Sequence, residues 1–255
     1  MTESLYPPDM HPFVRKMESI ALFPLSRGEC AALRALPMHV ARFDAYQDIV
    51  REGDRPSRCF ALLEGLVAAY KTTPSGKRQV MAYHVVGDVP DLQSLHLKVL
   101  DNSIATISPS RIGFVEHDAL HVLFREQPKL LEVFWRSTLI DAALVREWML
   151  NIGRREAYAR LAHLFCELIT RLDAVGLAPE RSCSLPMTQP ELADALGITP
   201  VHVNRTVRDL RAAGLVTVRG RRLTVDDWEG LKAAAEFDPT YLHLGPEAGA
   251  ERPTS

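Results

Sequence analysis

Asn204 and Arg205 are adjacent side chains of the types that read nucleobase edges. An arginine can make a bidentate contact to O6 and N7 of guanine, and an asparagine can pair in the same way with adenine. Val201 and Arg208 share a helix face with them, and Val201 could touch a thymine methyl. His202 could reach a base or a phosphate, or be an ordinary surface histidine. We predict base reading by Val201, His202, Asn204, Arg205 and Arg208.

The residues around this pair have the spacing of two short helices joined by a tight turn. Thr188 and Glu191 form a capping box, which begins a helix. Gly197 permits the positive φ that a tight turn requires, and Thr199 can cap the next helix. An ordinary helical pair could have this spacing too. A second helix over 199–213 with arginines on its open face is typical of a helix-turn-helix that binds double-stranded DNA.

Positive charge is concentrated in the same region of a chain whose net charge is −2. Between 199 and 222, six arginines stand against one aspartate, which suggests an anionic partner. Residues 215–218 and 222–225 can pair as a hairpin, or wing, around Gly220. We expect contacts with DNA phosphates from wing arginines and from polar groups at helix starts: Thr188, Gln189, Thr199, Arg219, Arg221 and Arg222.

Upstream, residues 38–115 have the pattern of short antiparallel strands. Gly53, Gly65, Gly76 and Gly87 are 11 or 12 residues apart, and each interval suits one strand and a turn, as in a sandwich or barrel. We therefore predict an α+β fold with an antiparallel, jelly-roll-like β-roll first, then a long helix and a winged helix-turn-helix. The expected boundaries are 13–127 for the β-roll, 128–153 for the helix, 154–240 for the winged domain and 241–255 for a disordered tail.

The long helix carries an apolar heptad seam, with steps that alternate between four and three residues. Its members are Leu131, Trp135, Thr138, Ala142, Val145, Met149 and Ile152. A second apolar surface comes from Leu139, Leu144, Trp148 and Leu150. A helix that is apolar on two sides needs two partners. We expect one to be the β-roll and the other to be the same helix of a second subunit, which makes a homodimer.

Several classes of protein are disfavoured by what the sequence lacks. No apolar run approaches the ~20 residues that cross a bilayer, and the first residues do not resemble a secretory signal, so we expect a cytoplasmic protein without a membrane partner. The four cysteines are scattered, which favours neither disulfides nor a metal site. We find no His-x-His pair in 1–115 and no phosphate-loop or nucleophile-elbow motif, so a cupin-like enzyme is a distant alternative.

Together these features resemble the Crp/Fnr family of bacterial transcription regulators over about residues 15–235. The turns Glu52-Gly53-Asp54, Leu63-Glu64-Gly65 and Gly87-Asp88 stand where the family's cyclic-nucleotide-binding β-roll turns. The run T-x-x-E-L-A-x-x-L-G-I-T at 188–199 and the Asn-Arg pair at 204–205 look like the family's DNA-reading segment. The resemblance implies a homodimer that binds a two-fold symmetric operator and contacts RNA polymerase.

The resemblance weakens at the effector site. Family members that bind cyclic AMP have an arginine, followed by serine or threonine, that neutralises the cyclic phosphate. Asn102 stands at that arginine's position and is followed by Ser103. Asp88 and Asp91 lie in the same stretch and would repel a phosphate. Our candidates for the effector pocket are Asp88, Asp91, Asn102 and Ser103, and we expect no response to cyclic AMP.

Other effectors remain open. The iron–sulfur branch of the family carries an N-terminal cysteine cluster, and no cysteine precedes Cys30. A haem-sensing member would need axial ligands. His84, His96, His117 and His121 are present, but a lone histidine is more often an ordinary surface or core group, so a haem sensor is a disfavoured alternative. A different small molecule is compatible with the sequence, and so is a regulator that has no effector and is controlled by its abundance. We expect no cofactor and no metal.

Overall fold

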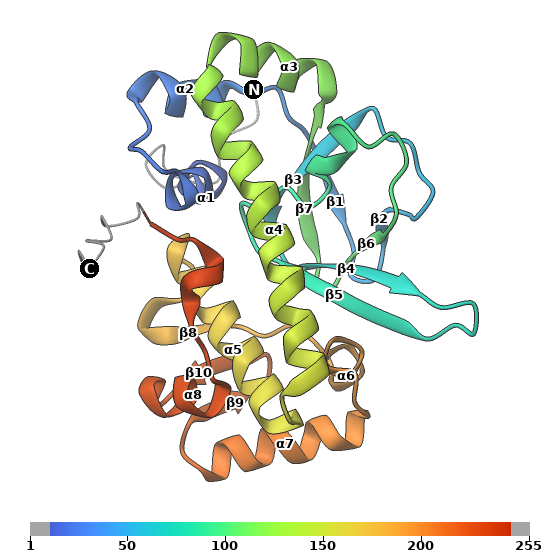
Figure 1. Ribbon diagram of the computed structural model, residues 1–255, viewed down its shortest axis with the longest axis vertical. Coiled ribbons are helices and arrows are strands. Elements are labelled where there is room, and N and C mark those ends of the chain that lie inside the picture. Colours follow the sequence, from blue (N-terminus) through green and yellow to red (C-terminus); the bar gives the residue numbers. More distant parts are fainter. Residues whose placement is uncertain (1–10, 246–255) are drawn as a thin grey trace, which may run out of the picture.

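A 27-residue helix, α4 (Pro128–Arg154), runs along the molecule between an N-terminal β-roll and a C-terminal helical domain (Figure 1). The computed structural model describes residues 11–245. The N-terminal part also contains α1 (Pro12–Ile20), α2 (Arg27–Ala35), the 3-10 helix η2 (Leu92–Leu95) and α3 (His117–Glu126). Pro128 takes the first position of α4, where its missing N–H costs nothing.

The β-roll consists of two antiparallel sheets, as predicted. One has the order β1-β7-β3, with β1 (His39–Phe43), β7 (Ser110–Glu116) and β3 (Arg58–Glu64). The other has the order β2-β6-β4-β5, with β2 (Asp48–Val50), β6 (Ser103–Thr106), β4 (Val67–Thr72) and β5 (Arg78–His84). All four predicted turn glycines have positive φ. Gly87 also leaves no room for a side chain, since a Cβ there would lie 2.6 Å from Cβ of Lys16.

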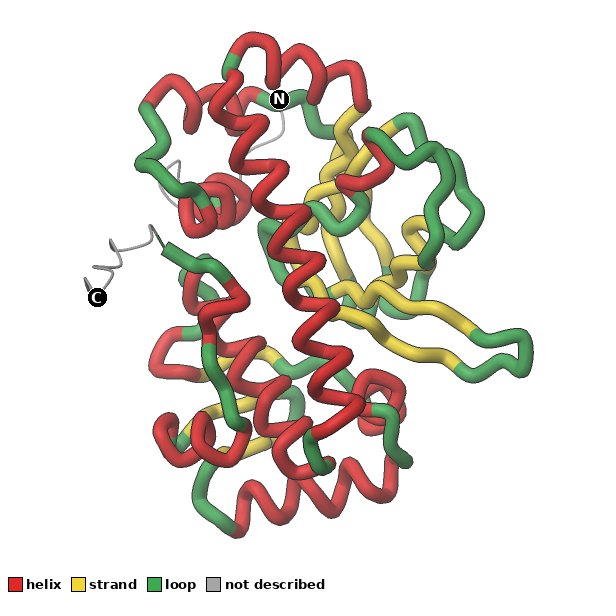
Figure 2. The backbone as a smooth tube through the Cα atoms, viewed as in Figure 1, coloured by secondary structure: helices red, strands yellow, loops and turns green. Residues whose placement is uncertain are grey.

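The C-terminal domain combines four α-helices with a small antiparallel sheet (Figure 2). In chain order it contains α5 (Ala157–Ala174), η3 (Pro179–Arg181), β8 (Ser182–Ser184), α6 (Gln189–Leu196), α7 (Pro200–Ala212), β9 (Val216–Arg219), β10 (Arg222–Val225), α8 (Trp228–Ala235) and η4 (Pro239–Leu242). The predicted wing is the hairpin β9–β10. The sheet order β8-β10-β9 adds a strand that we did not predict, because three residues give no alternating pattern to detect.

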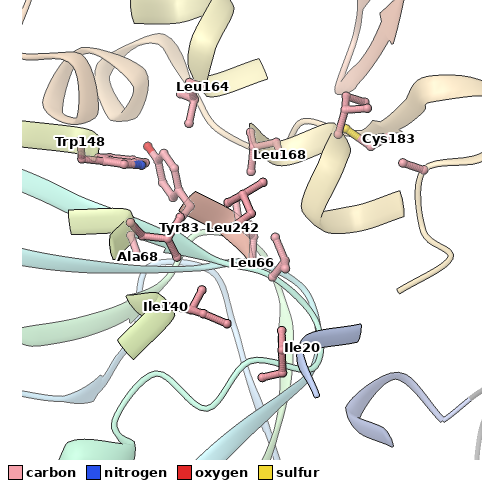
Figure 3. Packing of buried hydrophobic residues seen from close by; sticks show 14 of the residues in the cluster. Ile20, Leu66, Ala68, Tyr83, Ile140, Trp148, Leu164, Leu168, Cys183 and Leu242 are labelled. Carbon is pink, nitrogen blue, oxygen red and sulfur yellow. The ribbon is translucent and has the colours of Figure 1, made fainter. Parts of the chain in front are cut away.

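One buried core continues from the β-roll through α4 into the C-terminal domain (Figure 3). The rings of Tyr83 on β5 and Trp148 on α4 meet edge to face, with centroids 5.8 Å apart. Leu164 and Leu168 of α5 extend the same cluster. All four cysteines are buried and unpaired. Because the core is shared, the two domains are held in one arrangement by packing.

The predicted boundary of a disordered tail at residue 241 is wrong. Leu242 is buried, and the hydroxyl of Tyr241 donates a hydrogen bond to Oε2 of Glu167, 2.8 Å away. These two side chains fix η4 against the C-terminal domain, so Tyr241 and Leu242 are not part of a disordered tail. The rest of the expected tail, 246–255, lies outside the described residues.

Candidate nucleic-acid interface

Helices α6 and α7 are joined by the tight turn that the sequence predicted. At the start of α6, the N–H of Glu191 donates to Oγ1 of Thr188, and the carboxylate of Glu191 accepts from the N–H of Thr188. Gly197 ends α6 in the left-handed conformation at φ 66°. The hydroxyl oxygen of Thr199 then accepts a 3.3 Å hydrogen bond from the N–H of His202. Local chemistry therefore fixes the angle between the two helices.

Helix α7 has one buried face and one open face. Val203, Thr206 and Leu210 are buried against the domain. The opposite face presents Val201, which is 80% exposed, with Asn204, Arg205 and Arg208, which are also exposed. The structure thus brings four of the five predicted base-reading residues together on one surface.

His202 lies on the flank of α7 instead of the centre of its open face. It is half-buried, and its Nε2 is 3.5 Å from Nη2 of Arg205. Its backbone carbonyl also accepts a hydrogen bond from the hydroxyl of Thr206. From this position, His202 can orient the guanidinium of Arg205.

Three side chains that our sequence analysis missed hold α6 in place. The hydroxyl of Tyr83 on β5 donates to the carbonyl of Glu191, at 2.9 Å, and the amide of Gln79 donates to the carbonyl of Ala195, at 3.3 Å. Arg160 of α5 donates to the carbonyl of Leu196, at 2.9 Å, and so caps the end of α6. The first two partners are 108 and 116 residues apart along the chain, so no local sequence signal could reveal them.

The basic residues of this region are exposed and carry uncompensated charge. All six arginines between 199 and 222 are exposed, and none pairs with a carboxylate within residues 11–245. Two of them have a neutral partner close by: the guanidinium of Arg222 donates to the hydroxyl of Ser182, at 3.1 Å, and that of Arg205 lies 3.5 Å from Nε2 of His202. A surface of this kind attracts a polyanion.

The predicted phosphate-contacting groups at helix starts differ in what they can still offer. The hydroxyl of Thr188 donates to the carboxylate of Glu191, 2.7 Å away, so its proton is already used. Thr199 only accepts, which leaves its hydroxyl proton free for an oxygen of a ligand. Gln189 is exposed at the first position of α6. Arg219, Arg221 and Arg222 are exposed around the turn of the wing.

The predicted heptad seam forms an exposed stripe along α4. Met149 and Trp135 are 70% and 65% exposed, which is unusual for large apolar side chains. Leu131, Ala142 and Val145 are exposed as well. The two remaining members, Thr138 and Ile152, are half-buried.

The second apolar surface of α4 is only partly where we expected it. Leu144 and Trp148 are buried with the neighbouring residues of their face, in agreement with the prediction. Leu139 and Leu150 are exposed, so their assignment to that surface is wrong. Both positions are turned away from the core, which already fills the opposite face of the helix.

A cavity of about 250 Å³ lies between β4, β5 and α4. Among the predicted candidates, Asn102 lines it, together with His84, Asp101 and Asp141. Ser103 is not among the lining residues, and its hydroxyl accepts the N–H of Glu52. No lysine or arginine of the described chain lines this cavity.

Asp88 is not part of the effector cavity, which corrects the prediction. Its carboxylate is 2.9 Å from Nζ of Lys16 and 2.7 Å from Nη2 of Arg171. Burial alone would raise the pKa of the Asp88 carboxyl, but these two cations outweigh it and hold the pKa well below its usual value. Asp88 is therefore a buried charge neutralised by cations of α1 and α5.

Asp91 is also a structural residue. It is 1% exposed, and its Oδ1 accepts a hydrogen bond from the N–H of Phe60 at 2.9 Å. Burial raises the pKa of its carboxyl to about 8. The prediction that Asp91 is a negative charge facing the effector is therefore wrong, since at neutral pH this carboxyl is largely protonated and points into the β-roll.

Within residues 11–245, no group of three or more histidine, cysteine or acidic side chains is placed to hold a metal ion. The described helices also include none with the length and apolar character needed to cross a membrane.

Comparison with known proteins matches both domains. A model of the Crp-like helix-turn-helix domain matches residues 159–234, and a model of the cyclic nucleotide-binding domain matches residues 40–127. A probable transcriptional activator from Rhizobium leguminosarum bv. viciae is 28% identical over 211 residues, which cover 82% of this chain and 85% of the relative. The anaerobic regulatory protein of Haemophilus influenzae is 24% identical over 78% of this chain and 77% of its own length.

Solved structures agree on the fold. FixK2 from Bradyrhizobium japonicum superposes with a TM-score of 0.69 at 23% identity, over 77% of this chain and 96% of that chain. A CooA mutant from Carboxydothermus hydrogenoformans superposes with a TM-score of 0.61 at 18% identity, over 78% of this chain and 88% of that chain.

Proposed function

Since the chain belongs to the Crp/Fnr family of bacterial transcription regulators, we propose that it acts as a homodimer whose two α7 helices read a two-fold symmetric operator. The proteins of this family are regulators of transcription and not enzymes, which removes the cupin-like alternative. We further propose that it works in the cytoplasm, where its DNA lies, and that it contacts RNA polymerase as the family resemblance implies.

The observation that carries this proposal is the open face of α7. Arg205 and Arg208 can reach guanine, Asn204 can pair with adenine and Val201 can meet a thymine methyl. Their backbone is held rigidly by the buried Val203 and Leu210. His202 would act mainly by orienting Arg205.

Contacts with the phosphate backbone would fix the register of α7 in the groove. We assign them to Gln189, Thr199 and the wing arginines Arg219, Arg221 and Arg222. Thr188 would contribute through the geometry of its capping box, because its hydroxyl proton is already bound by Glu191.

The partner for the exposed stripe on α4 would be the same stripe of a second protomer. A row of large apolar side chains with heptad spacing is costly in water and is buried when two such helices pair. A homodimer of this kind places two reading helices on one duplex, which suits a two-fold symmetric site.

We also propose that cyclic AMP is not the effector. Its phosphate would lie in a cavity with Asp101 and Asp141 in the wall and without a lysine or arginine among the described lining residues. A buried anion without a cation costs several kcal/mol. Calorimetric titration with cyclic AMP should therefore give no heat of binding, whereas micromolar affinity would contradict this part of the proposal.

Selection of duplexes from a random library tests the proposal as a whole. We expect the protein to enrich an inverted repeat whose half-site centres lie about one helical turn (~34 Å) apart. Enrichment of a single, unrepeated site would argue against the dimer, and failure to enrich any sequence at modest salt would argue against DNA reading by α7.

A further inference from the structure

The carboxylate of Asp141 stands beside the exposed stripe of α4 without a partner. Asp141 is half-buried in the wall of the effector cavity, and its carboxylate makes no hydrogen bond or ion pair with another residue of the described chain. The nearby charges are His84, Asp88, Lys16 and Arg171. Lys16 and Arg171 are already bound to Asp88, at 2.9 and 2.7 Å. Asp141 therefore lacks a cation of its own.

Arg146, five residues further along α4, is also without a carboxylate. It is exposed, and no ion pair joins it to any residue in 11–245. Residues five apart on one helix do not face each other, since helical neighbours are three or four residues apart. The two opposite charges consequently cannot neutralise each other within one protomer.

We propose that Asp141 of each protomer forms an ion pair with Arg146 of the partner subunit, and that the two pairs set the parallel, in-register packing of the α4 helices. This inference rests on the homodimer proposed above. The inference names the residues that determine the orientation of the partner subunit and that complete the wall of the effector cavity.

Heptad geometry leads to this pairing. If Leu131 is assigned to position d of the heptad, Ala142 falls at a and Val145 at d. Asp141 is then at g, and Arg146 is at e of the next heptad. In a parallel two-stranded coiled coil, each g residue meets the following e residue of the other helix, and these charges determine partner and orientation. An antiparallel pair of helices would not bring these two residues together.

The same heptad register explains why Leu139 is exposed although we predicted it on the second apolar surface. It falls at position e of the preceding heptad and is 57% exposed in the protomer. In the parallel dimer, it would be covered at the edge of the same interface. Trp135, Val145 and Met149 of the seam are exposed in the protomer as well, so this surface is free for a second copy.

The partner also closes the effector cavity. Four residues that line the cavity also lie in the seam or at its edge: Thr138, Asp141, Ala142 and Val145. A second helix lying along the seam would place the guanidinium of Arg146 of the partner subunit at the mouth of the cavity. Because Asp141 neutralises that guanidinium, the ion pair adds no net charge to the wall of the cavity.

Charge reversal tests the pairing. Asp141→Arg alone places four arginines at the two contacts, and Arg146→Asp alone places four aspartates there. We expect each single variant to dimerise roughly tenfold or more weakly than the wild type in sedimentation velocity, because like charges face each other. Mixing the two variants creates attractive contacts on both sides, so heterodimers should form with nearly wild-type affinity.

Two further proteins complete the experiment. The double variant Asp141→Arg/Arg146→Asp restores both attractive contacts within one chain and should dimerise like the wild type. Arg154→Asp removes an exposed arginine from the same helix, at position f, and should leave dimerisation unchanged. Circular dichroism of each variant establishes that its helices are formed.

The outcomes separate this inference from the proposed function. A wild type that is monomeric at all concentrations would overturn the homodimer itself. A dimeric wild type whose single variants dimerise equally well, or whose mixed and double variants stay as weak as the single ones, would overturn the ion pair alone. Binding of the selected operator by the wild type, measured alongside, reports on DNA reading independently.

Discussion

At the scale of single residues, the roles that the sequence predicted correctly depend on close neighbours in the chain. Thr188 caps α6 through Glu191, three residues away, and Gly197 takes the positive φ that its turn requires. The open face of α7 follows from helical periodicity. These features need no knowledge of the rest of the molecule, which is why the candidate interface could be predicted.

Arg205→Ala should weaken specific binding and relax specificity at one base pair. Loss of a bidentate contact to guanine costs about 1–3 kcal/mol, and the alanine no longer discriminates the base. Fluorescence anisotropy with the selected operator, with single-base variants of it and with random duplexes provides the measurement.

Arg221→Ala is the matched control for Arg205→Ala, since it removes an exposed arginine of the wing. It should lower affinity for all duplexes alike and make the dependence of log K on log salt shallower by about 1. If Arg205→Ala behaved in the same way, with equal losses on specific and random DNA, Arg205 would be a phosphate contact and not a base reader.

The residues that the sequence misassigned depend on partners far along the chain. Asp88 was counted as a negative charge in the effector pocket, but it is neutralised by Arg171, which lies 83 residues away. Asp91 was counted in the same way, although the backbone of Phe60 binds it inside the β-roll. Only the folded structure shows which side of a strand or turn such carboxylates occupy.

Asp91→Asn should change how stability depends on pH. Burial raises the pKa of Asp91 in the folded protein to about 8, above its ordinary value of 3.8. The folded state therefore binds the proton of Asp91 more tightly than the unfolded state does. The stability that this protonation contributes is complete below pH 4 and is lost as the pH rises toward 8. The free energy of unfolding should fall by up to ~1.4 kcal/mol per pH unit in this window.

Asparagine keeps an oxygen that can accept the N–H of Phe60 and has no proton to lose. The variant should consequently lack this part of the pH dependence and become relatively more stable as the pH rises. Urea unfolding of both proteins between pH 5 and 8 gives the comparison. If the free energy of unfolding depended on pH in the same way for both proteins over this range, Asp91 would not titrate as the structure implies.

At the scale of elements, α4 carries the exposed stripe through which we propose that two protomers pair. Its sequence predicted a helix over 128–153, and the structure extends it by one residue. Heptad spacing identified the stripe, because a helix repeats its faces every 3.6 residues whatever its tertiary partners are. The same reasoning missed β8, since a three-residue strand is defined by its pairing with β10 and not by its own sequence.

Met149→Glu should convert the dimer into monomers. Met149 is the most exposed large apolar side chain of the seam, and a carboxylate there would be buried against its own copy. Analytical ultracentrifugation at micromolar concentration provides the measurement. Leu150→Glu is the control, because Leu150 is the exposed neighbour outside the seam and should leave the dimer intact. A dimer that survived Met149→Glu would place the interface elsewhere.

At the scale of the whole molecule, a buried ion-pair network joins the two domains. Arg171 of α5 is 2% exposed in its side chain and binds Asp88 of the β-roll at 2.7 Å and Glu167 at 3.1 Å. It also donates to the carbonyl of Tyr83, at 2.8 Å. Glu167 accepts hydrogen bonds from Trp148 and Tyr241. The sequence could not predict this docking, because its contacts come from residues scattered over most of the chain.

Arg171→Met should strongly destabilise the protein. Two buried carboxylates would lose a cation, and breaking a buried ion pair by removing one partner costs about 3–5 kcal/mol. Chemical denaturation of the variant and the wild type measures the loss. Arg125→Met, a change of the same kind at an exposed position of α3, should shift stability by less than about 0.5 kcal/mol. If the two variants were equally stable, the network would not hold the domains together.

The central claim is that two α7 helices of one dimer read one duplex, and half-site spacing tests it most directly. The affinity for the selected operator is compared with that for the same operator carrying five additional base pairs between its half-sites. Because half a helical turn moves the second half-site to the opposite side of the duplex, we expect affinity to fall at least ~100-fold. Equal affinity for the two duplexes would contradict the account.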